Sequence, residues 1–260
     1  DLFSQLEDNA VALSTMKASR FYQTFQKQID YWESTLAVMS EVVEMVLTVQ
    51  RQWMYLESIF MGSEDIRKQL PGESILFDRV NENWILIMNG IHDQPNAVAA
   101  TQKEGILDTL NATNDDLERI QKSLDQYLET KRQLFPRFYF LSNDDLLEIL
   151  GQQKDPGQVQ KHIKKCFEAI KALQMIPPGK QGNKTMEAAG MDSPDGEKVS
   201  FNTNVIVQGA VELWLIEVEK HMIACLQKLL RETLKAYPKN NRAQKERWIK
   251  EWPGQHLILA

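Results

Sequence analysis

Apolar side chains recur at helical spacing along most of this chain, and the longest such stretch runs from Arg20 to Met61. The stretch contains neither glycine nor proline. One apolar row repeats every seven residues and a second row follows it by four positions, which places both rows on one helix face. The two rows are Phe25, Trp32, Met39, Val46, Trp53 and Phe60, and Ile29, Leu36 and Val43. The pattern predicts one helix of about 40 residues, about 60 Å long, with Trp53 buried between helices.

The same periodicity predicts several further helices, which are separated by proline, glycine and short polar segments. They lie around Phe77–Ile91, Ala97–Phe135, Ser142–Gly151, Asp155–Ile170, Gln208–Ala236 and Arg242–Trp252. Gly105 and the polar stretch 111–114 weaken the second of these, so a break is expected there.

Several helix ends carry recognisable capping residues. Gly62 can supply the left-handed position after the first long helix, and Ser63 can cap the turn that follows. Ser142 and Asp145 form a capping box. Pro136 ends the helix before it, because the residue preceding a proline avoids the helical region.

One segment departs from the helical pattern. Pro177–Lys184 is rich in proline, glycine and lysine, and is predicted to be a surface loop. After it, Met186–Met191 and Glu197–Asn202 flank a turn made of Ser193, Pro194, Asp195 and Gly196. We expect a β-hairpin near 186–202 with an exposed tip, which is either a contact point or a bare structural protrusion. The predicted fold is therefore all-α, an elongated bundle of long helices with a small β-hairpin insertion.

Composition agrees with a globular helical protein: 43% of the 260 residues are hydrophobic and 25% are charged. The longest apolar runs, such as Trp84–Met88, fall far short of the roughly 20 residues of a membrane span. No signal peptide is recognisable, and Cys166 and Cys225 sit inside helical patterns, which favours reduced thiols. The chain lacks an initiator Met and stops after the apolar run Leu257–Ala260, so we interpret it as a fragment truncated at both ends.

Charge is unevenly distributed. Residues 1–150 hold 13 basic and 24 acidic side chains, a net charge of −11, and residues 151–260 hold 17 and 12, a net charge of +5. The acidic and basic halves either face different partners or are simply solvated, and solvation is the simpler interpretation.

Two motifs resemble catalytic or ligand-binding sites without meeting their requirements. Gly179–Thr185 is glycine- and lysine-rich, but its spacing departs from that of a phosphate loop and no buried strand precedes it. Glu217, His221 and Cys225 fall four residues apart on one predicted helix, but a zinc site usually gathers its ligands from more than one segment. We predict no catalytic residues, no bound cofactor and no metal site.

A basic stretch with interleaved tryptophans lies near the C-terminus. It contains Lys235, Lys239, Arg242, Lys245, Arg247 and Lys250, together with Trp248 and Trp252. Such a patch can bind nucleic acid. However, the chain as a whole is acidic, with a pI of about 5.4, and the tryptophans equally suit a helix that packs on its neighbours. We predict neither a nucleic-acid nor a membrane partner.

Several sequence runs, taken in order, resemble the linker region of dynein heavy chains. They are SRFY (Ser19–Tyr22), VQRQWMYLESIF (Val49–Phe60), SEDI (Ser63–Ile66), QLP (Gln69–Pro71), FPRFYFLSNDDLLEILG (Phe135–Gly151), the hairpin Asp192–Phe201 and VELWL (Val211–Leu215). The resemblance covers nearly the whole chain. The run Phe140–Asp145 is more similar to axonemal heavy chains than to cytoplasmic transport dyneins.

The resemblance implies that residues 1–260 are part of one linker domain, a helical arch that lies across the AAA+ ring of the same heavy chain. In this family the linker bends and straightens as the ring hydrolyses ATP, and so moves the tail. ATP and magnesium would bind in AAA+ modules outside this chain. The implied partners are that ring and other dynein chains, in the axoneme of a cilium or flagellum.

Proline and glycine mark two candidate junctions where such a lever could bend: Pro71 with Gly72, and Gly151 with Pro156 and Gly157. Two other interpretations, which assign the chain to different functional classes of protein, remain. One is a static helical scaffold or adaptor without a motor role, and the other is a helical enzyme, for which no site is visible.

Overall fold

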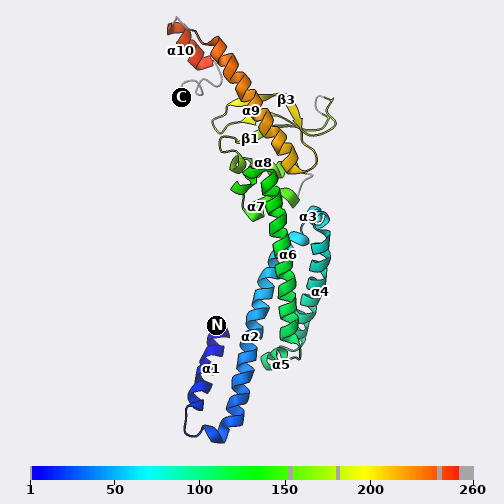
Figure 1. Cartoon of the computed structure of the whole chain (residues 1–260), viewed down its shortest axis with the longest axis vertical. Helices are drawn as coiled ribbons and strands as arrows, with labels where there is room; N and C mark the ends of the chain where they lie inside the picture. The colour runs from blue at the N-terminus through cyan, green and yellow to red at the C-terminus, as the bar shows by residue number, and fades with distance from the viewer. Residues whose placement is uncertain (1, 152–154, 180–181, 239–241, 252–260) are drawn as a thin grey trace. The chain divides into compact units, whose positions relative to one another are not determined.

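The computed structural model describes residues 2–151, 155–179, 182–238 and 242–251, and these form ten α-helices, one 3₁₀ helix and one three-stranded sheet (Figure 1). The mostly helical fold with a small β insertion is confirmed. The chain divides into two compact units, Asp1–Gln126 and Tyr127–Ala260, and the division falls inside helix α6. The charge boundary near residue 150 is therefore not the boundary between the units.

The first unit is built from long helices. Its elements are α1 (Leu2–Lys17), α2 (Tyr22–Phe60), α3 (Glu64–Gln69), α4 (Pro71–Asp93), α5 (Ala97–Thr101) and the first part of α6 (Ile106–Leu134). Helix α2 confirms the long uninterrupted helix, and α1, which the sequence pattern did not predict, packs back along its first half (Figure 1). The expected break before α6 occurs at Gly105, which has φ +74°. The helix then continues through 111–114 without interruption.

The buried face of α2 differs from the predicted one. The buried residues are Ile29, Thr35, Met39, Val42, Val49, Leu56 and Phe60, whereas Phe25 and Trp32 are 55% and 45% exposed. A strict seven-residue row drifts by about 20° per heptad on a straight helix. Six members of such a row therefore cannot all face the same neighbours, and the prediction that both rows share one face was wrong for Phe25 and Trp32.

Trp53 and Gly62 also depart from expectation. Trp53 is half-buried rather than buried: its ring lies 6.3 Å from that of Trp84 on α4, and its Nε1 donates a hydrogen bond to Asn81 Oδ1 at 3.0 Å. Gly62 does not adopt a positive φ. A glycine is nevertheless required at position 62, because the Cβ of any other residue would lie 2.4 Å from the Ser58 carbonyl oxygen.

The core of the first unit joins α2, α4 and α6. The rings of Phe60 and Phe77 stack at 5.4 Å, and both side chains are fully buried. Helix α6 adds Leu110, Leu117, Ile120 and Leu124, all with no exposed surface. Large apolar side chains buried to this extent each contribute roughly 1.5–3 kcal/mol to stability.

The second unit mixes helices with a small sheet. Its elements are the end of α6, the 3₁₀ helix η1 (Pro136–Phe140), α7 (Asn143–Gly151), α8 (Pro156–Cys166), β1 (Ala172–Ile176), β2 (Glu187–Asp192), β3 (Lys198–Ile206), α9 (Val211–Ala236) and α10 (Arg242–Glu251). The predicted hairpin is confirmed as β2 and β3, and α9 packs on it (Figure 1). The sequence pattern did not predict β1, and the helix predicted over Asp155–Ile170 ends earlier, at Cys166.

The sheet is antiparallel in the order β1-β2-β3. Both ladders are irregular close to Gly190, where a Cβ would lie 2.4 Å from the Val199 carbonyl oxygen and 2.7 Å from the Gln174 side chain. Beside β1, the side-chain amide of Gln160 on α8 donates to the Leu173 carbonyl at 2.8 Å and accepts from the Leu173 N–H at 2.9 Å. A helix side chain therefore satisfies both backbone groups of this residue.

Candidate functional site

The first predicted junction, Pro71 and Gly72, lies within the first turn of α4, with the proline at its N-terminal position. The irregular backbone is instead at Leu70, which has φ −124° and ψ 64° and separates α3 from α4. Arg67 and Asp78 bridge the two helices through two hydrogen bonds of 3.1 and 2.6 Å. This junction is therefore braced by a bidentate ion pair, the stronger geometry for a surface pair.

The second predicted junction separates α7 from α8. Gly151 is the last residue of α7, and Pro156 and Gly157 form the first turn of α8. Asp155 caps α8 by accepting a hydrogen bond from the Gly157 N–H at 2.9 Å. The part of the predicted junction formed by residues 152–154 lies outside the described residues.

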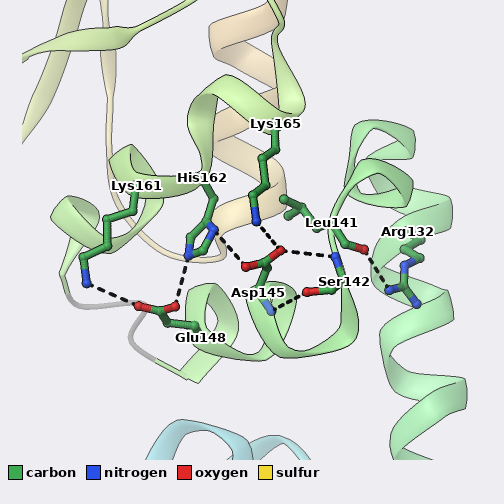
Figure 2. A network of polar contacts seen from close by, with 8 residues as sticks. All are labelled: Arg132, Leu141, Ser142, Asp145, Glu148, Lys161, His162 and Lys165. Atoms are coloured by element: carbon green, nitrogen blue, oxygen red, sulfur yellow. Dashed lines mark hydrogen bonds and ion pairs between the residues drawn. The ribbon is translucent and has the colours of Figure 1, made fainter.

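A polar network holds α7 and α8 together across this junction (Figure 2). Lys165 donates to Asp145 at 2.7 Å, while His162 Nε2 lies 3.1 Å and Lys161 Nζ 3.3 Å from Glu148. The His162 ring is buried and its Nδ1 lies 3.3 Å from Asp145, so the imidazole sits between two carboxylates.

The carboxylates of this network are held in their charged form. The Lys165 ammonium and the Ser142 hydroxyl lower the pKa of Asp145 below its ordinary value, and His162 followed by Lys161 lowers the pKa of Glu148. Asp145 also completes the predicted capping box: its N–H donates to Ser142 Oγ at 3.2 Å, and its Oδ2 accepts a hydrogen bond from the Ser142 N–H at 3.4 Å. Asp145 therefore both caps the N-terminus of α7 and connects α7 to α8 through Lys165.

Arg137 is a second connecting residue, and the sequence analysis missed it. Its Nε donates to Glu219 on α9 at 2.7 Å, and its Nη1 donates to the Cys166 carbonyl at the end of α8 at 3.1 Å. The guanidinium also lies 4.6 Å from the centre of the Phe167 ring. The available signal was a charged residue between the buried aromatic residues Phe135 and Phe138, because a charge next to buried side chains needs a partner.

A buried ion pair connects α6 to α9. Lys131 Nζ donates to Glu212 Oε1 at 2.5 Å, and the two side chains are 12% and 3% exposed. The second carboxylate oxygen of Glu212 has no hydrogen-bond partner among the described residues. Glu212 was also missed, although an acidic residue within the apolar run Val211–Leu215 is the same kind of signal.

The predicted hairpin tip is exposed. Pro194, Asp195 and Gly196 are all exposed, Ser193 is half-buried, and Gly196 has φ +89°. The Ser193 hydroxyl accepts a hydrogen bond from the Glu197 N–H at 3.0 Å, which closes the turn. The tip takes no part in the polar network that joins α7 to α8, so the candidate residues form separate places rather than one site.

The motifs that resembled ligand sites have structural roles. His221 Nδ1 lies 2.8 Å from the Glu217 carbonyl and its Nε2 lies 3.1 Å from Thr203 Oγ1, while Cys225 is buried. Nowhere in the described part of the chain do three histidine, cysteine, aspartate or glutamate side chains gather as metal ligands would. In the glycine-rich loop, the Gly179 N–H donates to the Asn183 carbonyl at 2.9 Å. Lys180 and Gln181 of that loop lie outside the described residues.

In the basic, tryptophan-containing stretch, Trp248 is used for packing, whereas Lys235, Arg247 and Lys250 are exposed. Trp248 on α10 is buried and donates to the Thr233 carbonyl of α9 at 3.1 Å. Its ring meets that of Tyr237 edge-on at 5.1 Å. Lys239 and Trp252 fall outside the described residues. No described helix is long and apolar enough to cross a membrane.

In each unit, the described polar side chains form ion pairs and hydrogen bonds that link one helix to another. The described part of the chain is therefore a module built from connected helices. Comparison with known proteins identifies the module: the chain belongs to the dynein heavy chain family, since the family model "Dynein heavy chain, N-terminal region 2" matches residues 1–233. This confirms the resemblance inferred from the sequence runs.

Relatives with axonemal and flagellar names match the chain throughout. It is 56% identical over 262 residues to dynein axonemal heavy chain 2 of Homo sapiens, and the match covers 100% of this chain and 6% of that protein. It is 52% identical over 260 residues to the dynein-1-beta heavy chain, flagellar inner arm I1 complex, of Chlamydomonas reinhardtii, again covering 100% and 6%. Dynein axonemal heavy chain 12 of Mus musculus is 41% identical over 258 residues, covering 98% and 8%. The chain therefore spans less than a tenth of the length of these relatives.

Proposed function

We propose that this chain is a mechanical linker segment of an axonemal dynein motor. In this role it couples ATP-driven changes of the AAA+ ring of the same heavy chain to movement of the tail along microtubules. The ring and other dynein chains are its partners, and the axoneme of a cilium or flagellum is its location. ATP and magnesium bind to the AAA+ modules of the complete heavy chain, and the segment itself performs no catalysis.

The length of α2 is the observation that carries this proposal. It runs for 39 residues without interruption, about 58 Å at 1.5 Å per residue, whereas helices in globular proteins average about 10–14 residues. Helices α6 and α9, with 29 and 26 residues, are also long. A stiff helix transmits displacement along its axis, while a short junction between helices absorbs the change of angle.

A lever also requires two shapes of similar free energy, and in this proposal the two shapes differ at the junctions between the helices. ATP can favour one shape only if the ring contacts the two with different free energies. The braces at both junctions are surface or partly buried ion pairs, and such pairs contribute little enough to be exchanged between two shapes.

A glycine insertion separates this lever from the alternative, a static scaffold or adaptor. Gly-Gly inserted after Val43 weakens α2 by roughly 1 kcal/mol per glycine and rotates all later positions by about 200°. In the complete motor we expect ATP hydrolysis to continue while microtubule gliding stops. The same insertion directly after Gly151, where α7 ends, should leave both activities largely intact.

The two outcomes are distinct if folding of each variant is verified by circular dichroism and by normal basal ATPase activity. Gliding that tolerates both insertions equally would remove the support for a lever and favour the scaffold. Separately, the isolated chain should show no ATP turnover above background, and turnover that survives purification and disappears on a point substitution would favour the enzyme interpretation.

A further inference from the structure

A hollow on the second unit is bordered by the Arg137–Glu219 ion pair. Its volume is about 380 Å³, and it lies between the segment after α8, the end of the hairpin next to its turn, and the middle of α9. Its apolar lining consists of Phe167, Ala169, Ile170, Met191, Val199, Met222, Ile223 and Leu226. Ile223 and Leu226 are 52% and 38% exposed, so part of this apolar surface faces solvent.

The rim of the hollow is acidic. Three carboxylates, Glu168, Glu197 and Glu219, line it together with one cation, Arg137. Arg137 is paired with Glu219 at 2.7 Å. Glu168 and Glu197 are exposed and have no ion-pair partner within the described residues, which leaves the rim with a net charge of −2.

This local sign is opposite to that of the surrounding sequence. Residues 151–260 carry a net charge of +5, yet the uncompensated charges at the hollow are both negative. Lys198, the neighbour of Glu197, is not among the lining residues. An acidic peptide or an anionic lipid surface would be repelled at this position, whereas a cationic group would be attracted.

We propose that the hollow is a docking site for a protein segment that presents one large apolar side chain flanked by lysine or arginine. The apolar side chain occupies the lined floor, where Met191 and Met222 provide adaptable contacts. The flanking cations lie against Glu168 and Glu197. The volume falls within the range of about 300–1,000 Å³ typical of ligand pockets. The hairpin contributes to the hollow through Ser193, Glu197 and Val199, which flank its turn, whereas Pro194, Asp195 and Gly196 are not among the lining residues.

Short fluorescent peptides test this proposal on the full 260-residue chain by anisotropy. The first carries Lys-Phe-Lys between Gly-Ser caps, the second replaces both lysines with glutamate, and the third replaces the phenylalanine with alanine. We expect the first peptide to bind about tenfold more tightly than either of the others. The glutamate peptide loses the charge attraction to the acidic rim, and the alanine peptide loses the apolar contact with the floor of the hollow. Equal affinity for all three, or no measurable binding of the first, would overturn the proposal.

Matched variants locate the binding. Ile223→Gln removes apolar surface from the hollow, while Leu234→Gln changes a side chain of the same helix with the same 52% exposure outside it. We expect the first to weaken binding about tenfold and the second to leave it unchanged. Reversing the rim with Glu168→Lys and Glu197→Lys together should transfer preference to the glutamate peptide. Equal effects of Ile223→Gln and Leu234→Gln, or no change of preference after charge reversal, would refute this location.

Discussion

The buried ion pair between Lys131 and Glu212 allows a sharp test of how the second unit is held together. We consider Lys131→Met, which keeps a long apolar side chain of similar shape and removes the charge. Because Glu212 is 3% exposed, its carboxylate cannot recover its hydration when the ammonium is lost. Its second oxygen already lacks a hydrogen-bond partner among the described residues, so no described group nearby compensates.

The expected cost follows from the burial of both side chains. Breaking a buried pair by removing one partner typically destabilises a protein by about 3–5 kcal/mol. Replacing both partners with apolar residues is often neutral, because no uncompensated charge remains. We therefore expect Lys131→Met to cost about 3–5 kcal/mol and Lys131→Met with Glu212→Leu to cost less. Lys228→Met, at an exposed lysine of α9, should change stability by no more than about 0.5 kcal/mol.

The measurement must report on the second unit alone, since the chain forms two units and a global transition need not be two-state. Hydrogen exchange of α9 peptides, followed by mass spectrometry, gives the free energy of local opening. A loss of protection below about 1 kcal/mol in Lys131→Met, or a double variant as unstable as the sum of the two single variants, would refute this reasoning.

Three further outcomes are expected. Gly190→Ala should destabilise the sheet by roughly 1–3 kcal/mol, because the new Cβ would meet backbone atoms. Gly72→Ala should instead stabilise α4 by about 0.4–1 kcal/mol, because there is open space around the new Cβ. Thermal melts compare the two variants, and equal changes in melting temperature would contradict the packing argument. The pKa of Asp145 is lower in the folded state than in the unfolded state. The ionised Asp145 carboxylate therefore contributes fully to stability above the unfolded pKa of about 3.9. This contribution is lost as the pH falls through the lower folded pKa. Asp145→Asn should therefore narrow the difference in melting temperature between pH 7 and pH 3, and an unchanged difference would show that this carboxylate does not matter. Burial raises the pKa of the Cys166 thiol to about 11, so alkylation at pH 8 should be slow until the protein unfolds, as mass spectrometry would show; rapid labelling of the native chain would contradict the burial.

The long helices could be predicted from the sequence because the signals that define them are local. Arg20–Met61 has no residue that interrupts a helix, and α2 follows that stretch closely. The Ser142–Asp145 capping box and the Ser193–Gly196 turn are also local, since each needs only a few neighbouring residues to form. For the same reason Pro136 ends α6 as expected.

The features that were missed depend on contacts between distant segments. Strand β1 is a short segment whose burial does not alternate, and it is a strand only because β2 pairs with it. Which face of α2 is buried depends on the helices that pack along it, and periodicity alone cannot supply this information. The partners of Arg137 and Glu212 lie 82 and 81 residues away along the chain, so their roles could not be deduced from spacing.

The two hydrogen bonds between Gln160 and Leu173 have a consequence for self-association. An unpaired strand edge is a template on which another chain can add a strand, and native proteins block such edges in several ways. Here a helix-borne amide occupies the donor and the acceptor that an incoming strand would use at Leu173. The protection exists only once α8 has docked, so a chain in which α8 is displaced offers β1 to a second copy.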